Sequence, residues 1–178
     1  FYRLDKQQTV AAGIRYFTLG SITFTDDIGT PISTQNPNEF TLDLAYSRLF
    51  SDKMSGGITF RYIRSDLSKG SSVNGEPTKA GNAYATDIST FYRTPIHFGT
   101  QEGEWAWGIN ISNIGTKISY TEGDIKDFIP TNLRIGTAVT ANLDAYNKVM
   151  IGFDVNKLLV PSPPKYDTLN FLMLCFCL

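Results

Sequence analysis

The residues of this chain that could do chemistry are four carboxylates and four arginines on the polar side of alternating segments. They are Arg15, Asp43, Arg61, Asp87, Arg93, Glu104, Arg134 and Asp154. Two such carboxylates could serve as a general acid and a general base. Acidic and basic residues interleave evenly along the chain, however, and this pattern more simply predicts ion pairs that form a polar ladder on one face of a sheet.

No other group of residues predicts catalysis or metal binding. The single histidine, His97, lies beside Pro95 in an expected turn, without a second histidine near it. Cys175 and Cys177 have the wrong spacing for a zinc site. The acidic stretch 122–127 could hold Ca²⁺ only weakly, and a solvated loop explains it more simply. We therefore expect a protein that is not an enzyme and uses no cofactor.

Seven segments alternate with the period of a β-strand. In the clearest of them, 36–48, Phe40, Leu42 and Leu44 share one parity while Asp43 takes the other. Successive side chains of a strand point to opposite faces, so the segment separates an apolar surface from a polar one. The seven expected strands cover about residues 8–25, 36–48, 54–67, 82–94, 104–114, 131–143 and 148–157.

Composition limits the classes of protein that fit. The 178 residues have a formal net charge of -1, which gives no basic bias toward nucleic acid. Mean hydropathy is -0.14, and the sequence has no apolar run of about 18 residues that could form a transmembrane helix. A membrane-spanning strand needs only about 9–11 residues. The chain begins with Phe1 and shows no signal-peptide pattern, so we expect a mature form or a fragment.

The expected loops alternate between long and short. Residues 26–38, 68–81 and 115–130 form long loops, 51–53 and 144–147 short ones, and 95–103 a short-to-medium one. Outer-membrane barrels have this asymmetry, with short periplasmic turns and longer extracellular loops. The charges that depart from the polar parity lie near strand ends, where long side chains can reach the headgroups. They are Arg48, Arg64 and Lys148.

Aromatic residues are expected to lie in two belts, which membrane interfaces favour. The outer belt would contain Phe24, Phe40, Tyr62 and Tyr84, and the inner belt Tyr46, Phe50, Tyr92, Trp105 and Trp107. The alternative is a soluble sandwich or lipocalin-like barrel whose apolar parity faces inward. The polar parity is rich in Gly, Ala, Ser, Thr and Asn, which suits a crowded, hydrated lumen better than a solvent surface.

We therefore predict an all-β fold, an antiparallel transmembrane β-barrel of the outer-membrane type. Seven strands do not close a bacterial barrel, which has an even number from eight upward. Residues 1–167 are accordingly expected to form part of a larger barrel. Residues 168–178 are an apolar tail without alternation, and we expect them to lie outside the fold.

The amino-acid sequences of several segments resemble those of the PorV family of outer-membrane barrels, also called LptO. These are 15–26 (RYFTLGSITFTD), 36–48 (NPNEFTLDLAYSR), 61–67 (RYIRSDL), 108–115 (GINISNIG), 130–136 (PTNLRIG) and 156–164 (NKLLVPSPP). The resemblance covers about residues 10–167. It implies a FadL-like barrel of fourteen strands, of which these seven would be roughly the central half, in the outer membrane of a Bacteroidota-like bacterium.

The same resemblance implies a carrier in the type IX secretion system. Its partners would be outer-membrane lipid, the C-terminal signal domains of secreted cargo, the translocon and a PorU-like attachment complex, with no nucleic acid. The long loops would dock cargo through Asp26, Asp27, Asn36, Asn38, Lys69, Asn74, Glu76, Lys79, Glu122 and Asp124. The alternative function is a FadL-like outer-membrane channel for hydrophobic small molecules.

Overall fold

The computed structural model describes residues 1–67, 72–73, 76–99, 101–121, 126–144 and 147–160, with only the backbone at 72–73 and 76–77. The strands are β1 (Tyr2–Arg3), β2 (Gln8–Thr18), β3 (Ile22–Thr25), β4 (Pro31–Gln35), β5 (Asn38–Leu49), β6 (Met54–Asp66), β7 (Ser72–Val73), β8 (Glu76–Pro77), β9 (Gly81–Phe98), β10 (Gln101–Gly115), β11 (Asn132–Asn142) and β12 (Lys148–Leu158). No helix in these ranges is long and apolar enough to cross a membrane.

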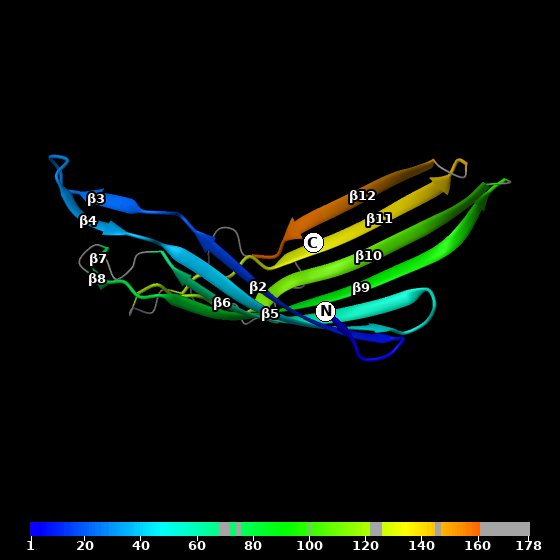
Figure 1. The fold of residues 1–178 in the computed structure, drawn as a ribbon, viewed down its shortest axis with the longest axis horizontal. Helices are drawn as coiled ribbons and strands as arrows, with labels where there is room; N and C mark the ends of the chain where they lie inside the picture. Colours follow the sequence, from blue (N-terminus) through cyan, green and yellow to red (C-terminus); the bar gives the residue numbers. More distant parts are fainter. Residues whose placement is uncertain (68–71, 74–75, 100, 122–125, 145–146, 161–178) are drawn as a thin grey trace.

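One antiparallel sheet contains all the long strands. Its order is β1-β2-β5-β6-β9-β10-β11-β12, a meander in which each long strand pairs with the next long strand along the chain. Figure 1 shows that the sheet is strongly curved rather than flat. The predicted all-β, barrel-type fold with seven long strands is confirmed. The sheet is not closed, because β1 and β12 are its two edges.

The first expected strand, 8–25, is wrong beyond Thr18. Gly20 adopts φ +77°, a left-handed conformation that interrupts the strand and is open to glycine. The following residues instead pair as a separate hairpin, β3–β4, which projects from the sheet beyond β2 and β5 (Figure 1). The apolar parity of Ile22 and Phe24 continues that of β2, which is why the alternation alone suggested one strand.

The prediction of a turn over 95–103 is also wrong. Strand β9 continues to Phe98, and β10 begins at Gln101. Pro95 and His97 therefore lie in a strand. The pairing of β6 with β9 ends at Met54 and Tyr92, so the later part of β9 pairs with β10 alone. A proline that has no N–H costs little on such an edge.

Two of the tight turns are stabilised by carboxylate side chains that accept hydrogen bonds from backbone N–H groups. The carboxylate of Asp5 accepts the N–H of Gln7 at 2.7 Å, and this bond lowers the pKa of Asp5. Asp144 accepts the N–H of Asn147 at 2.8 Å. All connections at this end of the meander are short, whereas those at the other end are long.

The two faces of the sheet differ in what covers them. Ile14, Leu42, Tyr62 and Tyr84 form one cross-strand row. Ile14 is 76% and Tyr84 64% exposed, so this apolar face has no covering layer among the described residues. The small buried core lies on the polar face, where the connection between β10 and β11 packs against Ala83 and Ala85 of β9.

Candidate functional site on the polar face

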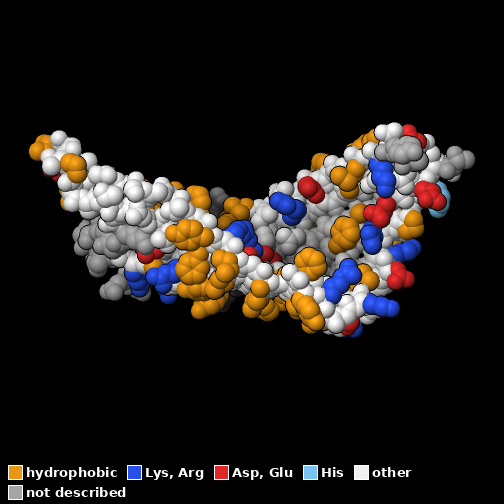
Figure 2. All heavy atoms as spheres, viewed as in Figure 1, with side chains coloured by type: hydrophobic (Ala, Val, Ile, Leu, Met, Phe, Trp, Pro, Cys, Tyr) orange, Lys and Arg blue, Asp and Glu red, His pale blue; other side chains and the backbone are white. Residues whose placement is uncertain are grey.

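The strand register places all eight residues of the predicted polar ladder on the same face. Asp43 pairs with Arg61 across β5 and β6, and the remaining six residues follow the same parity through the ladder of pairs. Figure 2 shows charged side chains spread over the visible face of the arm formed by β9–β12, while hydrophobic side chains gather along the lower side of the molecule.

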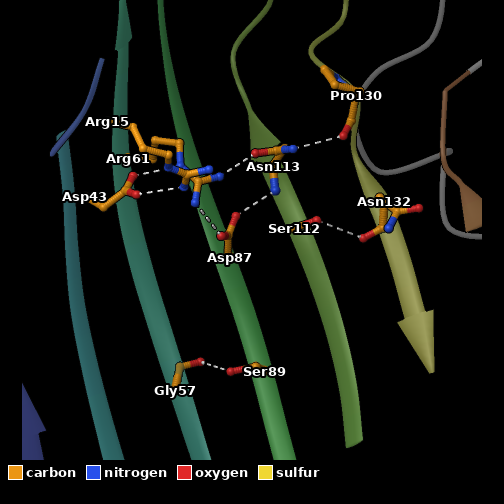
Figure 3. Close-up of polar contacts among 10 residues, drawn as sticks. All are labelled: Arg15, Asp43, Gly57, Arg61, Asp87, Ser89, Ser112, Asn113, Pro130 and Asn132. Atoms are coloured by element: carbon orange, nitrogen blue, oxygen red, sulfur yellow. Dashed lines mark hydrogen bonds and ion pairs between the residues drawn. The ribbon is translucent and has the colours of Figure 1, made fainter. Parts of the chain in front are cut away.

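Four of the eight residues form a continuous chain of ion pairs around Arg61. Its Nε lies 2.7 Å from Oδ1 of Asp43, which is directly opposite, and its Nη2 lies 3.0 Å from Oδ2 of Asp87, which is diagonal to it (Figure 3). Arg15 reaches the other oxygen of Asp43 at 3.0 Å. The side chains of Arg61, Asp43 and Asp87 are only 14–19% exposed, whereas that of Arg15 is 71% exposed.

Asn113 completes this cluster, and the sequence patterns did not single it out. Its side-chain oxygen accepts Nη1 of Arg61 at 2.7 Å, and its backbone N–H donates to Asp87 at 2.7 Å (Figure 3). Asn113 has φ +57° and lies in a β-bulge between Ile111 and Ile114. The extra residue keeps both isoleucines on the apolar parity. Two apolar residues three apart inside an alternating strand are therefore the signal that could have revealed it.

Asn113 also connects the cluster to the chain between β10 and β11. Its side-chain NH₂ donates to the carbonyl of Pro130 at 3.1 Å, and its own carbonyl accepts the hydroxyl of Thr131 at 2.8 Å. We call the described residues 116–121 and 126–131 the strap. The end of the strap that leads into β11 therefore meets the wall of the sheet at the ion-pair cluster.

The strap folds back over the polar face. Ile118 and Ile129 are 8% and 7% exposed and pack with Ala83 and Ala85, which are 0% and 4% exposed. The hydroxyl of Tyr120 donates to Ser65 of β6 at 3.1 Å. The connection 115–130, which was expected to be a long loop, thus buries Ile118 and Ile129 against the sheet.

The other four ladder residues lie farther along the same face and are exposed. They are Arg93, Glu104, Arg134 and Asp154. In the described ranges none of them forms an ion pair; Arg134 instead donates from Nε to the side chain of Asn156 at 2.8 Å. Arg134 and Asp154 line a shallow hollow of about 480 Å³ together with Phe91 and Met150.

The predicted docking residues divide between the projecting hairpin and the other long connections. Asp26 holds the hairpin turn by accepting the N–H groups of Ile28 at 3.0 Å and Thr30 at 2.7 Å. Asn36 accepts the hydroxyl of Ser21 at 2.8 Å. The remaining residues are distributed as follows: Asp27 lies in the hairpin turn, Asn38 begins β5, Glu76 contributes backbone to β8, Lys79 donates its N–H to Tyr120, and Lys69, Asn74, Glu122 and Asp124 lie outside the described residues.

The chemistry of the cluster is structural. Two arginines balance two aspartates, and most of their hydrogen-bonding groups are occupied by one another, which suits a clamp between strands. Within the described ranges no group of three or more His, Cys, Asp or Glu could hold a metal ion. The cluster joins five strands (β2, β5, β6, β9 and β10) and the strap at one level of the sheet.

Comparison with known proteins gives one family. A family model described as "Type IX secretion system protein PorV" matches residues 1–165. No curated protein matches the chain.

Proposed function

Because the chain belongs to the PorV family, we propose that it forms part of an outer-membrane barrel that receives secreted cargo proteins. In this proposal the barrel passes the cargo to a cell-surface attachment complex. Membership of the family makes the chain a component of the type IX secretion system. The observation that carries the membrane placement is the uncovered apolar face of the sheet, which lies opposite a face that holds the buried charges.

Rows of aromatic side chains support a membrane on the apolar face. Toward the long-loop end, Tyr62 packs edge-on against Phe40 and at a tilt against Tyr84, with ring centroids 5.9 and 5.4 Å apart. Toward the short-turn end, Tyr92 packs against two tryptophans of β10. Tyr84 and Tyr92 are about 26 Å apart along β9 at about 3.3 Å per residue. The segment between these two residues, both included, has nine residues, which agrees with the about 9–11 residues that a tilted transmembrane strand needs.

The open edges of the sheet must be paired if this face lies in lipid. Each unpaired backbone group in the hydrocarbon region costs several kcal/mol. The outer edge of β12 and the edge formed by β1 and β2 carry such groups along their length. The proposal therefore includes further strands, outside the described sheet, that complete the barrel.

The hairpin β3–β4 is the best described candidate for cargo docking. It projects at the long-loop end (Figure 1), and its turn presents Ile28, which is 87% exposed. Ile32 on β4 is 69% exposed. An apolar tip held rigid by Asp26 suits contact with a folded β-domain, such as the signal domain that cargo of this system carries.

Capture of cargo by variants of the protein expressed from its whole gene tests this function. Ile28→Asp combined with Ile32→Asp should reduce co-purification of cargo, and so should scrambling 68–81. Leu143→Asp, a change of the same kind at the short-turn end, should not. Normal capture by both loop variants would overturn the docking proposal. Uptake of a long-chain fatty acid into liposomes, without cargo capture, would favour the channel instead.

A further inference from the structure

We propose that the strap closes the lumen of the barrel near its long-loop end and that Asn113 is the latch that holds it there. The inference rests on the proposed function in one respect, because it takes the polar face as the face that lines the lumen. It goes further in assigning a role to the strap. The barrel would act as a closed carrier that holds cargo at its rim, and not as a passage.

The first support is that the strap is part of the packed structure. Gly81 of β9 lies beneath it, and a Cβ at this position would come within 2.7 Å of Ile118 and 2.9 Å of Tyr120. The backbone pairs as well, since the N–H of Lys79 donates to Tyr120 at 2.8 Å. A loop that merely rested on the sheet would not require a glycine under it.

The second support is pairing within the strap and at its start. Ile118 and Asp127 exchange two backbone hydrogen bonds of 2.8 Å, so the two described parts of the strap are fixed to each other. Thr116 donates its N–H to Tyr84 of β9 at 2.9 Å. A Cβ on the adjacent Gly115 would lie 2.1 Å from the same carbonyl of Tyr84, so the chain turns onto the polar face in close contact with β9.

The third support is the position of Asn113. Its amide is the one side chain in the described cluster that contacts both the wall, through Arg61, and the strap, through Pro130. Loss of that amide would leave Arg61 with its two carboxylates and remove the direct contact to Pro130. A substitution of Asn113 can therefore remove the contact with the strap while the ion pairs of the wall remain.

Closure is supported by the apolar side chains of the strap that cover the polar face beside the cluster. Ile118, Ile129 and Tyr120 cover Ala83, Ala85 and the buried side of β6 at a level where the opposite face meets lipid. A lumen lined by polar groups would admit water and ions at this level, whereas an apolar layer seated on a neutral ion-pair cluster excludes them.

Cysteine accessibility tests the position of the strap. The native cysteines are replaced (Cys175→Ser, Cys177→Ser), and Ala83→Cys is compared with Ala45→Cys, which lies on the same face but outside the strap. A charged methanethiosulfonate reagent should modify the residue at 83 at least about tenfold more slowly, because modification requires local opening of the strap. Equal rates would overturn the proposal.

Release of the strap tests its role. Asn113→Gly keeps the left-handed backbone and removes the latch, and Ile118→Asp disrupts the packing directly. Each should raise the rate of modification at position 83 and increase permeation of a bulky polar antibiotic through the outer membrane of cells that carry the variant gene. Migration of the unheated barrel on a denaturing gel identifies variants that do not fold, and Asn113→Gly is the variant designed to survive that control.

The outcomes separate this inference from the proposed function. Faster modification at position 83 with unchanged permeation would overturn closure and leave cargo carriage untouched. Increased permeation with normal cargo capture supports both. Loss of cargo capture in the variant that combines Ile28→Asp with Ile32→Asp, with the residue at 83 still protected, supports the proposed function independently of the strap.

Discussion

Arg61 faces Asp43 directly across the β5–β6 pair, and the Nε of the arginine lies 2.7 Å from the carboxylate. The same guanidinium reaches Asp87 on β9 and the amide of Asn113 on β10. One side chain on β6 therefore connects three neighbouring strands to its own. A buried charge is tolerated when it is paired and its hydrogen-bonding groups are satisfied, and this geometry meets both conditions.

Arg61→Met should destabilise the barrel strongly, because it leaves Asp87 partly buried without a counter-charge and leaves Asp43 with only the exposed Arg15. Loss of one partner from a buried pair costs about 3–5 kcal/mol. Arg15→Met is the matched control, and its cost should be below about 1 kcal/mol because the Arg15 side chain is 71% exposed. Urea unfolding in lipid vesicles, followed by tryptophan fluorescence, measures both. Equal effects of the two variants would show that the Arg61 cluster does not stabilise the wall.

Two substitutions of Asn113 should separate the free-energy cost of backbone strain from the cost of lost hydrogen bonds. Asn113→Gly keeps φ +57° at no steric cost and loses only the side-chain bonds. Asn113→Ala loses the same bonds and adds about 1–2 kcal/mol of left-handed strain. The alanine variant should therefore unfold at lower urea concentration than the glycine variant. The reverse order would mean that β10 follows a different path at the bulge.

The strand pattern and its two faces could be predicted from the sequence because alternation of side chains is a local property. The face on which Leu42, Asp43 and Leu44 each lie can be assigned from their alternation alone, without any other segment. The end of β2 could not be predicted in this way, since Ile22 and Phe24 continue its parity and only the conformation of Gly20 separates them. Alternation reports where side chains point, and it does not report where the backbone turns.

The central member of the candidate site was missed for a related reason. The charged residues of the cluster followed from parity, but Asn113 lies where an inserted residue breaks parity. Residues 115–130 were expected to form a long loop because they are rich in charge. Ile118 and Ile129 are too far apart in sequence to show a common face. Their packing against Ala83 depends on long-range contacts that alternation does not encode.

Gly115→Ala should impair folding, because the added Cβ would lie 2.1 Å from the carbonyl oxygen of Tyr84 and 2.8 Å from Cα of Ala85. Backbone atoms cannot move aside as a flexible side chain can, so the cost should be at least about 1–3 kcal/mol. Gly13→Ala on β2 is the control, since a Cβ there has nothing within 4 Å. The yield of heat-modifiable barrel measures both variants, and a normal yield for Gly115→Ala would contradict the close contact at the start of the strap.

Phe60→Lys decides whether the apolar face meets lipid. Phe60 lies in the middle of β6 on that face and is 58% exposed, so in a soluble protein a lysine there would be nearly neutral. In a membrane, a lysine at the midplane of the lipid face costs about 2–4 kcal/mol.

Thr59→Lys is the matched control one residue away, on the opposite face and paired with Asp87. Its lysine would point toward the polar cluster and should cost less than the lysine at 60. The free energies of unfolding of both variants in lipid vesicles give the comparison. A smaller loss for Phe60→Lys than for Thr59→Lys would reverse the assignment of the two faces, because only lipid makes the exposed position the more costly place for a charge.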